Sequence, residues 1–429
     1  MSNPTPDEAV ETSEIVETSD PLATSVETIA VRVILAPRKA RPFFGRHPWV
    51  FESAIEGVES PDGEEPAPGT AVELWSAKNE FIAHGLWNPH SNIRVRLYSW
   101  DQQQPVDSEL LKLRIHQAVE LRRLIFDLQN PQRGCRLVFS EADQLSGLTV
   151  DAYGRHLLVQ FTSLALYQFK DQIVAALQTE CAPDGIWLRT EKGMREAEQL
   201  EAVDGLICGV EPPSPVFLEE HGIRYGVDVQ QGQKTGCYLD QRDNRMAAAK
   251  YMKDARVLDA FCFSGGFGIV AVKQGRAASV VGIDSSESAL TMAAANAELN
   301  GVTAQCEYRR GDVRNELEAM AEQGSVFDVV VLDPPRMART RGGLSRALKG
   351  YLRINLSALK VLKPGGILVT CSCSGLVSRD EFCEMIGDVA RVANRPIQIL
   401  EQHGQPADHP ISATCPETEY LKMLICRVL

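Results

Sequence analysis

The sequence has no long apolar run and no amino-terminal leader pattern. No stretch of about 18 consecutive apolar residues occurs, so no membrane-spanning helix is expected. Residues Met1 to Thr5 are not a basic region followed by an apolar one, which a secretory signal would need. These absences argue against a membrane or secreted protein and favour a cytoplasmic one.

The cysteines and histidines form no familiar metal-binding pattern. None of the 11 cysteines belongs to a C-x-x-C pair, and no H-E-x-x-H sequence occurs, so no metal site is expected. Reduced cysteines in a cytosolic protein are the simplest interpretation. With 429 residues, the chain is long enough for two or three domains, each with its own core.

Negative charge is concentrated at the amino terminus. The formal net charge is −13, and residues 1–28 supply −7 of it, because they hold seven acidic side chains and no Lys or Arg. We expect this acidic tail to be disordered, since it is rich in Ser, Thr, Glu and Pro. The remaining −6 does not exclude a local basic face that binds nucleic acid.

Residues 29–105 are predicted to form a small all-β domain. Short strand-like runs such as 30–35, 71–75 and 93–98 are separated by turn residues. Basic side chains cluster in the same segment, and Lys and Arg contacts to phosphates supply most of the non-specific affinity for nucleic acids. The candidate RNA-binding residues are Arg38, Lys39, Arg46, Arg94 and Arg96.

Two motifs in this segment resemble those of the PUA domain, an RNA-binding pseudo-barrel. They are Arg46-His-Pro-Trp-Val-Phe51 and Asn88-Pro-His-Ser-Asn-Ile-Arg-Val-Arg96. Residues 106–221 then mix helix and strand patterns, with an amphipathic helix predicted over 107–128 and another helix over 164–179. We expect a middle α+β domain that ends near His221.

The stretch 257–269 predicts a buried strand, a glycine turn and the start of a helix. In an open α/β sheet, ligands bind outside the carboxyl ends of the strands, near such a turn. Gly265 and Gly266 would let the backbone approach a ligand closely. A relaxed dinucleotide pattern is present at 266–271, but its first glycine does not directly follow the strand. A dehydrogenase is therefore the least favoured class.

Acidic residues follow successive apolar runs and favour a ligand with a ribose and an adenine but no phosphate. Asp284 would accept hydrogen bonds from the ribose hydroxyls, Asp312 from the adenine amino group, and Asp259 would lie near an amino-acid ammonium. S-adenosylmethionine carries all three groups, and Tyr238 could stack near it. The cofactor-binding candidates are Asp259, Gly265, Gly266, Asp284, Asp312 and Tyr238.

Four motifs together are similar to those of the large-subunit ribosomal RNA methyltransferase I family. They occupy residues 233–245, 259–267, 332–336 and 372–375. The resemblance covers roughly residues 30–429 and implies an α/β fold: a PUA domain, a middle domain, and a class I, Rossmann-like methyltransferase domain over 222–429. It also implies methylation of cytosine C5 in 23S ribosomal RNA. The chain departs from the pattern in its acidic tail and in a second cysteine, Cys371.

Methylation at cytosine C5 requires a nucleophile, because C5 becomes enamine-like only after a thiolate has added to C6. Cys373 lies at the mouth of an apolar strand and matches the family's position, so it is favoured over Cys371, which continues the strand. Asp333 precedes two prolines and is expected to hydrogen-bond cytosine N3 or the exocyclic amine. The target base must be unpaired or flipped out. The proton-abstracting base is not identifiable from sequence.

Two other functional classes stay open at this point. An N-methyltransferase acting on guanine or protein would use the same cofactor pocket without a covalent step, and Cys373 argues against it. A non-catalytic RNA-binding or ribosome-assembly protein would not need the series Asp259, Asp284, Asp312 and Asp333. The sequence leaves the oligomeric state open, a homodimer included.

Overall fold

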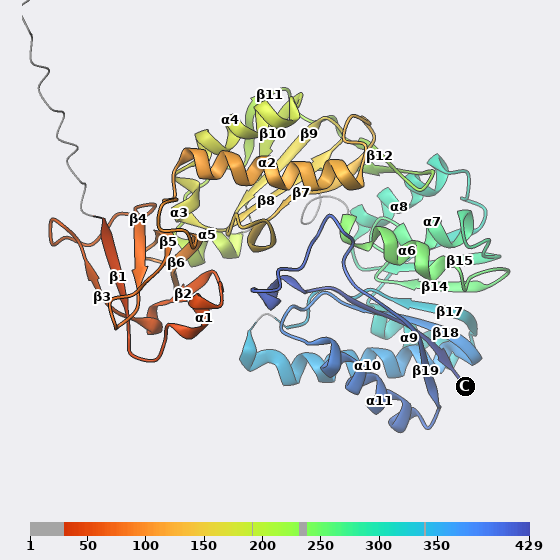
Figure 1. The fold of residues 1–429 in the computed structure, drawn as a ribbon. Coiled ribbons are helices and arrows are strands. Elements are labelled where there is room, and N and C mark those ends of the chain that lie inside the picture. The colour runs from red at the N-terminus through yellow and green to blue at the C-terminus, as the bar shows by residue number, and fades with distance from the viewer. Residues whose placement is uncertain (1–29, 191, 231–237, 339) are drawn as a thin grey trace, which may run out of the picture.

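The computed structural model describes residues 30–190, 192–230, 238–338 and 340–429, which form four sheets and the helices around them (Figure 1). The acidic tail that was predicted to be disordered lies outside these residues. Within the described part of the chain, no helix combines the length and apolar character needed to cross a membrane.

The N-terminal sheet has six strands in the order β2-β6-β5-β4-β1-β3. β1 pairs in parallel with β4, and the other neighbours are antiparallel. Alternating apolar residues, among them Val33, Leu74 and Leu97, fill its core. Its elements are β1 (Val31–Leu35), α1 (Arg41–Phe44), β2 (Trp49–Phe51), β3 (Ile55–Glu59), β4 (Ala71–Trp75), β5 (Phe81–Trp87) and β6 (Ile93–Ser99).

The middle sheet has five strands in the order β11-β10-β9-β8-β7, and α2 and α4 pack beside each other with their apolar residues in its core. α2 starts where the Asp107 carboxylate accepts a hydrogen bond from the Leu110 amide at 2.8 Å. It stops before residue 128, the predicted end, because Phe126 is extended. The elements are α2 (Ser108–Ile125), β7 (Gly134–Phe139), β8 (Leu148–Tyr153), β9 (His156–Phe161), α3 (Leu164–Tyr167), α4 (Lys170–Cys181), β10 (Gly185–Leu188), α5 (Lys192–Glu198) and β11 (Gly205–Gly209).

The single helix predicted over 164–179 is wrong, because the chain forms α3 and α4 instead. Ser163 caps α3 by accepting a hydrogen bond from the Leu166 amide. The helix then breaks at Gln168 and Phe169, and Phe169 becomes the N-cap of α4.

The C-terminal sheet has seven strands in the order β16-β15-β14-β17-β18-β20-β19. The first five are parallel, and β20 runs antiparallel to both neighbours. The strand order reverses between β14 and β17, which is where ligands bind in open α/β sheets. The strands are β14 (Arg256–Ala260), β15 (Ser279–Asp284), β16 (Cys306–Arg310), β17 (Phe327–Leu332), β18 (Leu362–Ser372), β19 (Ile397–His403) and β20 (Lys422–Val428).

Helices cover both faces of this sheet (Figure 1). One apolar core lies under α9, α10 and α11, and others lie under α6, α7 and α8 on the opposite face. A hairpin, β12 (Val216–Glu220) and β13 (Ile223–Val227), packs against α8. The helices are α6 (Arg242–Ala249), α7 (Gly266–Lys273), α8 (Glu287–Leu299), α9 (Val313–Glu322), α10 (Leu344–Val361) and α11 (Arg379–Ala393).

A buried ionic cluster joins the middle sheet to the C-terminal sheet. Asp408 is fully buried and accepts hydrogen bonds from the Arg136 amide at 3.1 Å and from the Arg242 guanidinium at 3.3 Å. Arg242 also lies 3.5 Å from a Glu220 carboxylate oxygen and stacks on Phe126. Arg242 and Arg245 both form ion pairs with buried carboxylates.

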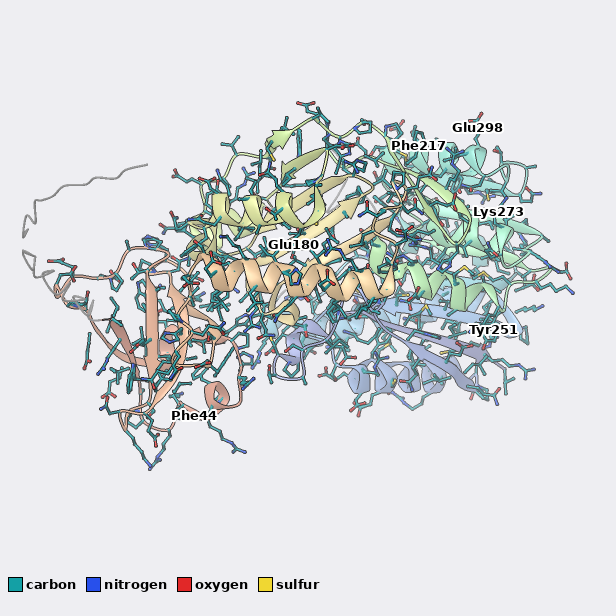
Figure 2. The ribbon with its side chains drawn as sticks, turned by 45° about the horizontal axis from the view of Figure 1, so that its top comes forward. Phe44, Glu180, Phe217, Tyr251, Lys273 and Glu298 are labelled. Atoms are coloured by element: carbon teal, nitrogen blue, oxygen red, sulfur yellow. The ribbon has the colours of Figure 1, made fainter. Side chains whose placement is uncertain are left out.

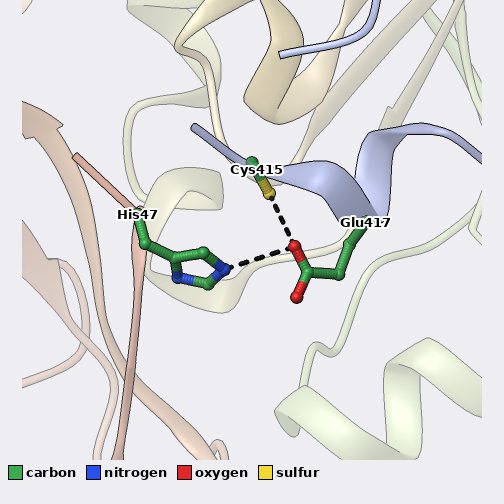
Figure 3. A group of neighbouring side chains, drawn as sticks. All are labelled: His47, Cys415 and Glu417. Atoms are coloured by element: carbon green, nitrogen blue, oxygen red, sulfur yellow. Dashed lines mark hydrogen bonds and ion pairs between the residues drawn. The ribbon is translucent and has the colours of Figure 1, made fainter. Parts of the chain in front are cut away.

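A second polar contact joins the N-terminal sheet to the C-terminal segment (Figure 3). His47 Nε2 lies 3.3 Å from Glu417 Oε2, and the buried Cys415 thiol lies 3.5 Å from the same oxygen. The Trp49 amide donates to His47 Nδ1, so the ring proton belongs on Nε2 and points at Glu417. These contacts therefore connect the N-terminal domain to the segment around Cys415.

Candidate active site

A pocket opens at the carboxyl ends of β14, β15, β17 and β18, where the strand order reverses. Its wall comes from the glycine turn after β14, from the ends of β15 and β17, from the loop after β18 and from the segment before α6. Of the predicted site residues, the pocket brings together Tyr238, Gly266, Asp284, Asp333 and Cys373.

The glycine turn has the backbone geometry that its sequence predicts. Gly265 has φ = 82°, a conformation that glycine adopts freely, and a Cβ there would lie 2.7 Å from the Tyr308 hydroxyl oxygen. Phe261 and Phe263 also have positive φ values, so the turn is tightly constrained. Gly266 begins α7 and lines the pocket, which leaves backbone exposed to a ligand.

Asp259 stabilises this turn through a buried hydrogen bond and does not line the pocket. It is 1% exposed, and one carboxylate oxygen accepts the Gly268 amide at 2.8 Å. Burial, together with the charges of Asp333 and Asp284, raises the pKa of Asp259 to about 7. Asp259 therefore stabilises the glycine turn.

Asp284 and Asp312 both follow strands, but only Asp284 reaches the pocket. The Asp284 carboxylate accepts the Phe263 amide at 3.0 Å and the Ser286 amide at 2.9 Å, which leaves lone pairs on both oxygens. Asp312 is exposed, lies outside the pocket wall and caps α9 by accepting the Asn315 amide at 3.1 Å. That Asp312 meets an adenine amino group stays a prediction.

Tyr238 lies in the pocket wall beside the glycine turn. Its ring meets Phe263 edge to face, with ring centroids 5.1 Å apart. Burial raises the pKa of Tyr238 well above its usual value, so the hydroxyl keeps its proton. Together the two rings form an aromatic surface next to Asp284.

The two cysteines after β17 have different surroundings. Cys373 is partly exposed in the pocket wall, and its thiol lies 3.8 Å from the Pro334 carbonyl, next to Asp333. Cys371 is fully buried within β18, and burial raises the pKa of its thiol well above the usual value. Of these two cysteines, Cys373 lines the pocket and Cys371 does not.

Hydrogen bonds lock the Cys373 loop to the loop after Asp333. The Ser374 hydroxyl accepts the Met337 and Ala338 amides, both at 3.2 Å, and lies 3.0 Å from the buried Tyr351 hydroxyl. Lys422 is 1% exposed and donates to the Ser374 carbonyl at 2.7 Å. Burial lowers the pKa of Lys422 to about 8. These contacts hold the thiol and the Asp333 carboxylate on one rigid wall.

Comparison with known proteins agrees with this architecture. Residues 33–100 match a family model described as a PUA-like domain, and residues 252–416 match one described as a methyltransferase domain. A "Ribosomal RNA large subunit methyltransferase I" from Photobacterium profundum is 40% identical over 385 residues, covering 89% of this chain and 96% of that protein. Its namesake from Tolumonas auensis is 40% identical over 403 residues, covering 94% of this chain and all of that protein.

The chain belongs to the ribosomal RNA large subunit methyltransferase I family. Solved structures agree on the fold. A SAM-dependent methyltransferase from Streptococcus mutans superimposes with a TM-score of 0.78 at 18% identity, over 92% of this chain and 100% of that one. The methyltransferase SMU.776, solved with SAH, gives a TM-score of 0.80 at 19% identity over the same shares of the two chains.

The RNA-binding candidates of this family member fall into two groups. Arg38, Lys39 and Arg46 are exposed on the N-terminal domain and form no ion pair with any described residue. Arg94 is partly buried, pairs with Glu52 at 2.7 Å and donates to the Ser91 carbonyl.

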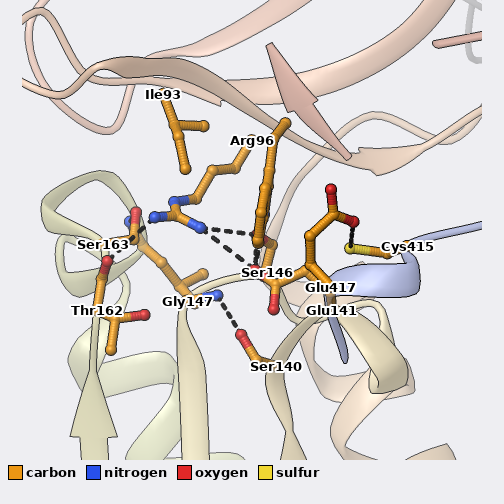
Figure 4. Close-up of polar contacts among 12 residues, drawn as sticks. Ile93, Arg96, Ser140, Glu141, Ser146, Gly147, Thr162, Ser163, Cys415 and Glu417 are labelled. Carbon is orange, nitrogen blue, oxygen red and sulfur yellow. Dashed lines mark hydrogen bonds and ion pairs between the residues drawn. The ribbon is translucent and has the colours of Figure 1, made fainter. Parts of the chain in front are cut away.

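Arg96 is 5% exposed, and its guanidinium faces the middle domain (Figure 4). It donates to Glu141 at 3.3 Å, to the Ser146 hydroxyl at 3.1 Å and to the Thr162 carbonyl at 3.2 Å. The prediction that Arg96 contacts RNA does not fit this burial, because reaching a phosphate would break a buried ion pair. Its role is to fasten the N-terminal domain to the middle domain.

A basic segment that sequence reasoning missed connects Asp333 to Cys373. Residues 334–372 contain eight Lys or Arg side chains and no Asp or Glu, in a chain whose net charge is −13. Arg336, Arg341 and Arg346 are exposed and form no ion pair with any described residue. Lys349, by contrast, lines a groove with three acidic residues of α11. The signal was present in the sequence as a local run without acidic residues.

Proposed function

We propose that this methyltransferase methylates cytosine C5 in 23S ribosomal RNA through a covalent adduct with Cys373. The observation that carries the proposal is the placement of Cys373, whose thiol lies in the pocket wall beside the Asp333 loop. An enzyme that alkylates a ring nitrogen has no need of a thiol there. The names of the curated relatives support ribosomal RNA of the large subunit as the substrate.

S-adenosylmethionine fits the half of the pocket formed by the glycine turn and Asp284. When bound, it supplies an electrophilic sulfonium methyl group. Asp284 has lone pairs for two ribose hydroxyls, Gly266 lies in the pocket wall, and Tyr238 with Phe263 forms an aromatic surface. Asp259 holds the turn in shape. Cys373 and Asp333 then face the space that remains for the target base.

Cys373 and Asp333 have separate roles in the proposed reaction. The Cys373 thiol gives its proton to solvent and the thiolate sulfur bonds to cytosine C6, which places electron density on C5. Asp333 hydrogen-bonds N3 or the exocyclic amine and stabilises the adduct. C5 would then take the methyl group as the sulfonium S–CH3 bond breaks and a neutral thioether leaves. A base removes the C5 proton, the C5–C6 double bond re-forms and the Cys373 thiolate leaves.

Arg38, Lys39 and Arg46 are proposed to contact the RNA backbone from the PUA domain. Phe44, 51% exposed, projects outward from α1 in the same region and offers a surface for base stacking (Figure 2). We further propose four functional units: an acidic tail over 1–28, the PUA domain over 29–105, the middle domain over 106–221 and the catalytic domain over 222–429.

Asp284→Asn is expected to weaken S-adenosylmethionine binding roughly 10- to 100-fold, because a charged acceptor of the ribose hydroxyls is lost. The measurement is isothermal titration calorimetry. Asp312→Asn is the matched control, since Asn caps a helix as well as Asp does and Asp312 lies outside the pocket. A larger loss in the Asp312 variant than in the Asp284 variant would refute this placement of the cofactor.

Arg341→Gln combined with Arg346→Gln is expected to weaken RNA binding and flatten its salt dependence. Each lost phosphate contact lowers the slope of log K against log[salt] by about one. The measurement is fluorescence anisotropy with a 23S fragment at several salt concentrations. Arg391→Gln serves as the control, because Arg391 is exposed but already pairs with Asp388. Equal slopes for the double variant and wild type would remove this segment from the RNA interface.

The proposed reaction is tested by product analysis. Undermethylated 23S RNA is incubated with the protein and methyl-labelled S-adenosylmethionine, and the RNA is digested to nucleosides for mass spectrometry. The expected product is 5-methylcytidine. Label in a methylated guanosine would instead establish the N-methyltransferase alternative, and no transfer at all would favour a non-catalytic role.

A further inference from the structure

Asp240 lies in the pocket wall, and buried neighbours hold it in place. It lies in the short helical turn Leu239–Gln241, just before α6, and lines the same pocket as Cys373 and Asp333. Leu239 and Gln241 are each 2% exposed, so the turn is fixed on both sides. Gln241 donates to Asp333 at 3.0 Å, which ties the turn to the proposed base-binding carboxylate.

The two oxygens of the Asp240 carboxylate differ in their surroundings. Oδ2 accepts a hydrogen bond from the Tyr420 hydroxyl at 2.6 Å. Oδ1 is buried in the pocket wall and has no hydrogen-bond partner among the described residues. Buried carboxylate oxygens are normally hydrogen-bonded, so an unpartnered one in a pocket calls for a functional explanation.

Tyr420 keeps Asp240 in place as an acceptor. Burial, and then the neighbouring Asp240 charge, raise the pKa of Tyr420 well above its usual value. The phenol therefore stays protonated and can only donate to Oδ2. This hydrogen bond orients the carboxylate and leaves Oδ1 as the atom that remains available for a proton.

The other two carboxylates of the pocket already accept hydrogen bonds and have other roles in the proposed mechanism. The pocket-lining carboxylates in the described part of the chain are Asp240, Asp284 and Asp333. Asp284 accepts two backbone amides at the end of β15, on the proposed cofactor side. Asp333 accepts from Gln241 and faces the target base in the proposed mechanism.

We propose that Asp240 is the base that removes the C5 proton. The proposal rests on the C5 mechanism above and completes it. After C5 has gained the methyl group, the Asp240 carboxylate takes the C5 proton and becomes a carboxylic acid. The C–H electrons form the C5–C6 double bond, the bond between Cys373 sulfur and C6 breaks, and the thiolate leaves. The proton then passes to solvent.

Asp240→Asn is the test, because it keeps the shape of the side chain while removing its basicity. The variant should methylate ordinary RNA once and then stall, so a covalent protein–RNA complex accumulates on a denaturing gel. Its turnover should fall by about 10²- to 10⁴-fold. Asp243→Asn is the matched control: Asp243 is exposed on α6 and does not line the pocket, so no complex should accumulate. Adding Cys373→Ser to Asp240→Asn should abolish the complex.

The first control is that wild type forms an adduct with 5-fluorocytidine RNA. If it does, full turnover by Asp240→Asn would overturn the proposal. Inactivity of Asp240→Asn without a complex would overturn it as well. If wild type forms no such adduct, the C5 mechanism itself fails. A thermal melt checks that Asp240→Asn is folded. If it is not, Asp240→Ala is used with added formate: restored release of product supports the proposal, and stalling despite formate contradicts it.

Discussion

Replacing Cys373 with serine is expected to lower methyl transfer by at least about 1,000-fold while S-adenosylmethionine still binds with its normal affinity. The serine hydroxyl is a far weaker nucleophile than a thiolate, and it cannot add to C6 at a useful rate. Cys373 lies on the base side of the pocket, away from Asp284, so the cofactor half is unchanged. The measurements are methyl transfer to undermethylated 23S RNA and calorimetric binding of the cofactor.

Cys371→Ala is the matched control for this prediction. Cys371 is fully buried among the apolar residues under α6 and α7, and its thiol does not line the pocket. Its loss removes a small buried thiol and its hydrogen bond to Gln241, and activity is expected to stay within about threefold of wild type. An inactive, folded Cys371 variant beside an active Cys373→Ser would reverse the assignment of the nucleophile.

Asp408→Asn is expected to lower the free energy of unfolding by about 3 kcal/mol, because it leaves the buried Arg242 guanidinium with less compensating charge. Arg242 is 3% exposed, so water cannot replace the lost carboxylate. Urea unfolding followed by circular dichroism provides the measurement. Asp184→Asn is the control: its ion pair with Arg155 is half exposed and should contribute less than about 1 kcal/mol.

The same residue predicts a pH dependence of stability. Burial alone would raise the pKa of Asp408, but His409 and Arg242 outweigh it and hold that pKa well below its usual value. The carboxylate therefore stabilises the fold at pH values above its unfolded-state pKa of about 3.9, and this contribution is lost as the pH falls below that value. The Asn variant should lack this part of the acid destabilisation. Identical acid profiles for variant and wild type would show that Asp408 is not the group involved.

The sequence predicted those parts of the site that depend on local chain geometry. The glycine turn was readable because Gly265 and Gly266 follow a strand and precede a helix. Asp333 and Cys373 come from neighbouring parallel strands, whose carboxyl ends meet at one edge of the sheet. Their proximity therefore follows once the strand pattern is recognised.

Other assignments depended on contacts between distant segments. A strand-end aspartate and a helix N-cap aspartate look alike in sequence, so the sequence did not show that Asp312 caps α9. The basic residues of 93–98 were predicted to contact RNA, but the middle domain covers Arg96 through Glu141 and Glu198. The orientation of the Asp240 carboxylate depends on a hydrogen bond from Tyr420, which lies 180 residues away in the sequence.

The most direct test of the account is trapping with 5-fluorocytidine-containing ribosomal RNA and S-adenosylmethionine, followed by a denaturing gel. Fluorine at C5 cannot be removed as a proton, so the bond between Cys373 sulfur and C6 should persist. We expect a stable protein–RNA complex that Cys373→Ser abolishes. No complex from wild-type protein that still methylates ordinary RNA would contradict the covalent C5 mechanism.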